Sequence, residues 1–159
     1  WLCGWGHENE EQMICATPGC EFARAMSPQT QELAGLLLLA ECFGQVTSVE
    51  RIHPLYEKAL RNCEEYISKR KLKIHFYDGK SGFNDEAPYD AIFFSASLEK
   101  FPGELIEQVK DGGVVLAPTG SNLQYLLAGI KELSSSESFL ISSYDMVSYV
   151  PLKEGLNRS

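Results

Sequence analysis

The sequence from Ile74 to Gly120 reads IHFYDGKSGFNDEAPYDAIFFSASLEKFPGELIEQVKDGGVVLAPTG. It contains an expected strand at 74–77, apolar runs without alternation at 91–94 and 114–117, and an amphipathic segment at 105–109. Strands that are covered on both faces have such unbroken apolar runs, and a helix commonly separates two of them in a parallel sheet. The stretch therefore predicts a strand–helix–strand unit of a parallel sheet.

The residues before this stretch continue the same alternation. Leucine, alanine and phenylalanine recur at helical spacing over 32–43, and Gly44 follows as a helix C-cap. A strand is expected at 45–50, a helix from Pro54 to residue 67, and another strand at 71–77. This order predicts a doubly wound, mostly parallel α/β sheet.

The C-terminal third is expected to contain a helix at 123–133, followed by strands at 138–143 and 147–152. Two successive strands predict an antiparallel hairpin at the edge of the sheet. The N-terminal residues 1–21 are interpreted as an irregular arm, in which 12–15 could alternatively form a short strand. Residues 22–159 are then expected to form a single domain.

Three segments together resemble one known family. They are YDGKSGFNDEAPYDAIFFSAS at 77–97, LIEQVKDGGVVLAPTGS at 105–121 and VSYVPL at 147–152. In this order and spacing they are similar to the second half of the protein-L-isoaspartate O-methyltransferases, enzymes that depend on S-adenosylmethionine (SAM). The resemblance runs from about Gly44 to Leu152. It implies the Rossmann-like fold of SAM-dependent methyltransferases, with an antiparallel C-terminal edge.

The same resemblance implies a reaction. A methyl group passes from SAM to the side-chain carboxylate of an isoaspartyl residue, which starts the repair of a damaged protein. A carboxylate with a pKa near 4 is ionised at neutral pH, so the reaction needs no general base. A protein or peptide substrate is therefore expected, and no catalytic residue can be named.

The residues that would bind SAM are sought at the carboxyl ends of the strands, where ligands bind in open α/β sheets. Glu50 ends the strand at 45–50, and its carboxylate can accept hydrogen bonds from both ribose hydroxyls, the role that the resemblance implies. The structural alternative is a surface acid paired with Arg51 or Lys58.

Two further strand ends carry candidate cofactor-binding residues. Asp78 can accept a hydrogen bond from the adenine amine, and Gly79 lets the base approach; alternatively, Asp78 only caps its own turn. Ser95, Ala96 and Ser97 follow the strand at 91–94, where small side chains leave space for the methyl donor. Their alternative is an ordinary turn.

The loop between the first strand and the first helix departs from the family's pattern. A SAM-binding loop needs glycine, because its backbone lies close to the ligand and adopts positive φ. The family's spacing puts the loop at 27–33, which has no glycine and contains Pro28. A loop at 17–21, after a strand at 13–16, has one glycine but requires an insertion. Neither placement is a complete fingerprint.

Two other functions therefore stay open. The chain could be a catalytically inactive homologue that serves as a structural or binding subunit of a larger assembly. It could also be a SAM-dependent enzyme that methylates another carboxylate or a small molecule.

Composition excludes several classes of protein. The formal net charge of −8 disfavours nucleic-acid partners, because phosphates would be repelled. The apolar runs are shorter than the ~20 residues of a membrane span. The odd number of cysteines, five, favours reduced thiols and a cytoplasmic location.

A metal site is not expected. Cys3, His7, Cys15 and Cys20 could be drawn as zinc ligands, but the chain has no tight Cys-x-x-Cys pair. At 159 residues the chain is short for a complete enzyme of this family, and its first residue is Trp1, which leaves open whether an N-terminal segment precedes it.

Overall fold

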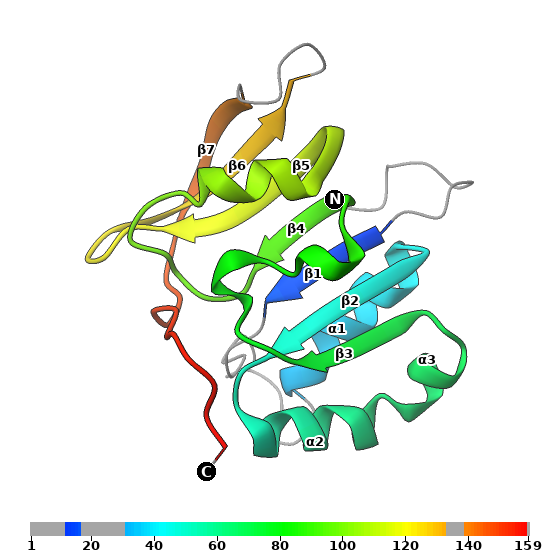
Figure 1. Ribbon diagram of the computed structural model, residues 1–159. Helices are drawn as coiled ribbons and strands as arrows, with labels where there is room; N and C mark the ends of the chain where they lie inside the picture. Colours follow the sequence, from blue (N-terminus) through cyan, green and yellow to red (C-terminus); the bar gives the residue numbers. More distant parts are fainter. Residues whose placement is uncertain (1–11, 17–30, 133–138, 159) are drawn as a thin grey trace.

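The computed structural model describes residues 12–16, 31–132 and 139–158 (Figure 1). In chain order its elements are β1 (Gln12–Ala16), α1 (Gln31–Cys42), β2 (Gln45–Glu50), α2 (His53–Asn62), α3 (Glu64–Ser68), β3 (Leu72–Phe76), the 3-10 helices η1 (Gly79–Ser81) and η2 (Asn84–Glu86), β4 (Tyr89–Phe94), the 3-10 helix η3 (Gly103–Gln108), β5 (Val109–Thr119), β6 (Gln124–Lys131) and β7 (Phe139–Val147). The strands form one sheet in the order β3-β2-β1-β4-β5-β6-β7. From β3 to β5 neighbouring strands are parallel, whereas β6 and β7 are added antiparallel. The expected α/β class with an antiparallel C-terminal edge is confirmed.

The first strand lies in the centre of the sheet. β1 pairs in parallel with β2 on one side and with β4 on the other. The prediction of an irregular arm over residues 1–21 is therefore wrong for the five residues 12–16. The alternative prediction, a short strand, is confirmed there. The rest of the arm lies outside the described residues. A single domain over 22–159 stays a prediction.

The core is divided between the two faces of the sheet. Ile92 and Phe94 of β4 belong to one apolar cluster, and Ala91 and Phe93 belong to or pack on the other. Alternate residues of a strand point to opposite faces, so the two clusters lie on opposite faces. Helices α1, α2 and α3 cover the second cluster, while η3 and the loop after η1 cover the first.

The helices follow the apolar pattern of the sequence. Leu36 and Ala40 of α1 are buried, one turn apart. The helix expected from Pro54 to residue 67 is divided into α2 and α3 at Cys63, which is fully buried. Burial raises the pKa of the Cys63 thiol to about 11.

None of the described helices combines the length and the apolar content that crossing a bilayer would require.

The connection from β4 to β5, residues 95–108, contains a 3-10 helix where an amphipathic helix is expected. The amphipathic segment at 105–109 lies largely in η3, whose Leu105 and Ile106 are buried. Pro102 precedes this helix and Val109 already belongs to β5, so only six residues are available. A single tight 3-10 segment buries the two side chains without the costly nucleus of an α-helix.

Two predictions at the C-terminus are wrong. Residues 124–131, expected to be helical, form β6, which pairs with β5 from Thr119 to Val114. The exposed edge of β5 offers a row of unpaired backbone groups, and pairing with it outweighs the weak helical preference of this segment. Strand β7 includes the expected 139–143 but ends at Val147, so 147–152 is not a strand.

The turn from β5 to β6 depends on Gly120. Its φ is +125°, and a Cβ placed there would lie 2.0 Å from the carbonyl oxygen of Leu123. We expect Gly120→Ala to lower the free energy of unfolding by about 1–2 kcal/mol more than Gly112→Ala. Gly112 also has a positive φ, +77°, but a Cβ there would meet open space. Gly112→Ala therefore measures the cost of backbone strain without a steric clash. Urea denaturation of both variants measures the difference, and equal losses would contradict this account of the turn.

Candidate functional site

The parallel strands bring the predicted site residues to one edge of the sheet. In the pairing of β2 with β3, Glu50 lies opposite Phe76, and Asp78 follows two residues later. Ala16 at the end of β1 pairs with Val49 on one side and with Phe94 on the other. The carboxyl ends of β1 to β5 therefore form one edge, here called the rim.

Glu50 is not a surface acid. Its side chain is 6% exposed, and its Oε1 accepts a hydrogen bond of 2.7 Å from the backbone N–H of Ile52. Arg51, one of the expected ion-pair partners, directs its guanidinium to the carbonyl oxygens of Glu154 and Gly155, at 3.5 and 2.9 Å. A carboxylate accepts hydrogen bonds through both oxygens, so Glu50 at the end of β2 has the chemistry to bind hydroxyl groups of a ligand.

Asp78 has partners of its own. Its Oδ1 accepts from the backbone N–H of Lys80 at 3.1 Å, which caps the first turn of η1. Its Oδ2 accepts from the N–H of Gly155 at 2.6 Å. The turn-capping role that the sequence left open is thus present, together with a long-range contact. Gly79 is buried in the same turn.

The small-residue turn after β4 is buried. Ser95, Ala96 and Ser97 are 5%, 0% and 5% exposed. The Ser97 N–H donates to the carbonyl of Val150, and the Ser97 carbonyl accepts from the N–H of Leu152, both at 2.8 Å. The turn thereby contributes backbone to a parallel bridge with the end of the chain.

Residues 148–158, here called the tail, run along the rim. After the bridge to the turn at 95–97, the tail meets Asp78 and then pairs with the residues that follow β2. Asn157 donates its N–H to the Arg51 carbonyl and accepts from the N–H of His53, both at 2.8 Å. Lys80 forms an ion pair with Glu154, and this hydrogen bond raises the pKa of the Lys80 amine. The tail was not predicted as part of the site, because most of its contacts use backbone atoms that carry no sequence signal.

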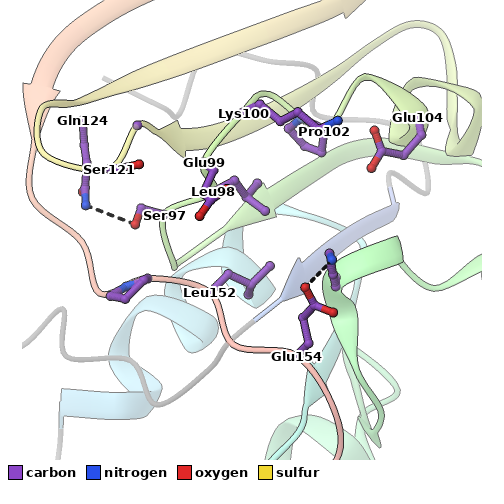
Figure 2. Close-up of a pocket in the computed structure, with 13 residues that line it drawn as sticks. Ser97, Leu98, Glu99, Lys100, Pro102, Glu104, Ser121, Gln124, Leu152 and Glu154 are labelled. Atoms are coloured by element: carbon purple, nitrogen blue, oxygen red, sulfur yellow. Dashed lines mark hydrogen bonds and ion pairs between the residues drawn. The ribbon is translucent and has the colours of Figure 1, made fainter.

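A cavity of about 740 Å³ opens at the β4 and β5 side of the rim and is here called the rim cavity (Figure 2). Its wall is formed by residues from 97 to 104 after β4, by the turn between β5 and β6 with the start of β6, by the tail, and by Lys80 of η1. The lining residues are Lys80, Ser97, Leu98, Glu99, Lys100, Pro102, Glu104, Gly120, Ser121, Gln124, Pro151, Leu152 and Glu154.

No group of metal-ligating side chains occurs within the described ranges. The zinc ligands considered from the sequence, Cys3, His7, Cys15 and Cys20, have side chains outside the described part of the chain. The loop from β1 to α1, residues 17–30, also lies outside it, and its sequence contains one glycine.

Comparison with known proteins shows which family this chain matches. A family model described as Protein-L-isoaspartate(D-aspartate) O-methyltransferase (PCMT) matches residues 34–157. A protein-L-isoaspartate O-methyltransferase of Vibrio atlanticus is 38% identical over 126 residues, which are 74% of this chain and 55% of the relative. One of Hahella chejuensis is 36% identical over 121 residues, 76% of this chain and 56% of the relative. The chain thus spans about half the length of these curated relatives.

Solved structures agree on the architecture. A protein-L-isoaspartate O-methyltransferase matches 93% of this chain and 44% of its own, with a TM-score of 0.71 and 20% identity. A putative enzyme of that name from Plasmodium falciparum, in complex with S-adenosyl-L-homocysteine, matches 91% of this chain and 66% of its own, with a TM-score of 0.63 and 20% identity. At such identity the likeness shows the fold.

Proposed function

We propose that this chain, which belongs to the protein-L-isoaspartate(D-aspartate) O-methyltransferase family, transfers a methyl group from SAM to the side-chain carboxylate of isoaspartyl residues in proteins. The proposal rests on which residues lie together at the rim. The buried carboxylate of Glu50 and the small-residue turn at 95–97 lie along the same edge of a sheet with this family's fold.

The described residues fit a nucleoside on the β2 and β3 side of the rim. Glu50 is placed to accept hydrogen bonds from ribose hydroxyls. Each carboxylate oxygen has about two acceptor positions, so Asp78 retains capacity for the adenine amine besides its two backbone donors. Gly79, Ser95 and Ala96, which follow the strands at this rim, have small side chains or none and would crowd a bound ligand little.

Bound SAM would supply a methyl carbon whose bond to sulfur breaks as its bond to the carboxylate oxygen forms, leaving S-adenosylhomocysteine and an ester. The acceptor is already ionised at neutral pH, so the chain needs only to hold it in line. Such orientation can supply on the order of 7–11 kcal/mol. The lining of the rim cavity, which contains neither histidine nor cysteine among the described residues, is compatible with catalysis by positioning.

The substrate would be a protein or peptide, and it would enter from the rim cavity. The acidic chain is unsuited to nucleic acid. A cytoplasmic location is supported by Cys42 and Cys63, both of which are thiols.

A second candidate is an inactive homologue that works as a subunit of a larger assembly. Two observations favour it: the single glycine in residues 17–30, and the contact of the tail with Asp78 on the nucleoside side of the rim. The two candidates differ in whether the rim binds SAM.

Calorimetry separates them. We expect heat of binding with SAM and with S-adenosylhomocysteine, and transfer of labelled methyl from SAM to a peptide with one isoaspartyl residue but not to the same peptide with aspartate. Absence of heat at millimolar ligand would reject the enzyme and leave the subunit. Binding of SAM without peptide methylation would point to a different methyl acceptor.

A further inference from the structure

Gln124, the first residue of β6, joins three parts of the rim-cavity wall (Figure 2). Its Oε1 accepts from the backbone N–H of Tyr149 at 2.6 Å, and its Nε2 donates to the Tyr149 carbonyl at 3.0 Å. The carboxamide thus pairs with one residue of the tail as a neighbouring strand would. The same Nε2 also donates to Ser97 Oγ at 3.1 Å.

The contacts of Gln124 continue into the tail. Ser97 Oγ donates to the Val150 carbonyl at 3.4 Å, and the Ser97 backbone holds Val150 and Leu152. One side chain therefore links the start of β6, the turn after β4 and the beginning of the tail. Since β7 ends at Val147 and the tail forms no strand from there, Gln124 substitutes for a missing strand partner at Tyr149.

The position of these contacts gives them a functional consequence. Ser97, Pro151 and Leu152 line the rim cavity together with Gln124, and Ser97 directly follows the buried Ala96 in the sequence. Backbone bonds of Ser97 join the turn to Val150 and Leu152, and the Gln124 carboxamide adds the bonds that join both segments to the start of β6. A shift at this wall would move whatever occupies the cavity relative to the nucleoside side of the rim.

We propose that Gln124 is a positioning residue for the methyl acceptor: its carboxamide fixes the Ser97 hydroxyl and the segment 149–152 as one wall of the rim cavity, where the acceptor would bind. The inference rests on the proposed function for the identity of the ligand. The role is indirect, because Gln124 acts through the wall rather than on the reacting atoms.

The chain contains a matched control. Gln108 also bridges two backbone groups with its carboxamide, donating to the Ser81 carbonyl at 2.7 Å and accepting from the Phe83 N–H at 3.1 Å. It is half-buried like Gln124 but does not line the rim cavity. Gln108→Ala therefore removes a similar bridge to Ser81 and Phe83, neither of which lines the rim cavity.

The experiment compares Gln124→Ala, Gln124→Glu and Gln108→Ala in the full chain. For Gln124→Ala we expect the KM for an isoaspartyl peptide to rise by about 10-fold, because peptide binding would then have to order the wall that the carboxamide holds in place in the free protein. The KM for SAM should stay within about 2-fold, since a loose wall lowers binding of the acceptor alone. Gln124→Glu keeps the acceptor for the Tyr149 N–H but loses both donated bonds, so it should raise the peptide KM as well. Gln108→Ala should not.

Amide hydrogen exchange provides a readout that is independent of turnover. Gln124→Ala should accelerate exchange at Tyr149 and Leu152, whereas Gln108→Ala should accelerate it at Phe83. An unchanged peptide KM in Gln124→Ala, or an equal rise in Gln108→Ala, would overturn the inference. If the wild-type chain binds no SAM, the proposed function fails by itself. In that case unchanged exchange at Tyr149 would also overturn the role of Gln124 in fixing the wall, and accelerated exchange would retain it.

Discussion

Glu50→Ala should weaken binding of SAM by about 2–3 kcal/mol, or roughly 30- to 150-fold in dissociation constant, if the rim binds the cofactor as proposed. The reason is that Glu50 presents a buried carboxylate at the end of β2, and hydrogen bonds to a buried charge are stronger than bonds between neutral groups. Titration calorimetry with S-adenosylhomocysteine measures the change without turnover.

Two comparisons make this result specific to Glu50. Glu50→Gln keeps the shape of the side chain but loses its charge, and we expect it to recover part of the affinity. Glu65→Ala removes an exposed acid of α3 that pairs with Lys69, and it should leave the affinity for the ligand unchanged. If Glu50→Ala bound the ligand as tightly as the wild type while retaining its thermal stability, the nucleoside would have to lie elsewhere.

Phe94→Ala should lower the free energy of unfolding by about 3–5 kcal/mol. Phe94 is fully buried at the end of β4, where it belongs to the apolar cluster with Leu105 and Ile106 of η3. Replacing the ring by a methyl group leaves a cavity that a central strand, paired on both sides, cannot collapse to fill. The midpoint and slope of urea denaturation measure the loss.

Leu38→Ala is the corresponding control. Leu38 lies on α1 with 67% of its side chain exposed, so the same kind of truncation should change the free energy of unfolding by no more than about 0.5 kcal/mol. A midpoint shift in Phe94→Ala at an unchanged slope would identify a loss of stability. A loss below about 1 kcal/mol would show that the β4 core is not closely packed around this ring.

The parallel half of the sheet was predictable because its strands are buried on both faces. The runs at 91–94 and 114–117 contain no polar residue, and such runs have few alternatives in a globular chain. The segment at 124–131 has no comparable pattern, and only pairing with β5 makes it a strand. Residues 12–16 were obscured by their polar and glycine-rich surroundings, although parallel pairing with two neighbours places them centrally.

The candidate site was predictable where it depends on the ends of strands. Glu50, Asp78, Ser95 and Ala96 were found by their positions after strands, and the structure places them on one rim. Their roles toward SAM stay predictions. Gln124 could not be found in this way, because its segment is predicted to be helical and its partners, the Tyr149 backbone and the Ser97 hydroxyl, lie 25 and 27 residues away in the sequence.

The tail is anchored mainly through its main chain. Ser97 holds Leu152, and three residues later Asp78 and Arg51 hold Gly155. Because these contacts use main-chain atoms, substitutions at Lys153 and Glu154 should be tolerated. An insertion or deletion between Leu152 and Gly155 should not be, because it would move one of the two contacts out of register. The distance between the two halves of the rim is therefore set by the number of residues between the two anchors of the tail. The identity of those residues matters less, so this feature leaves no sequence motif.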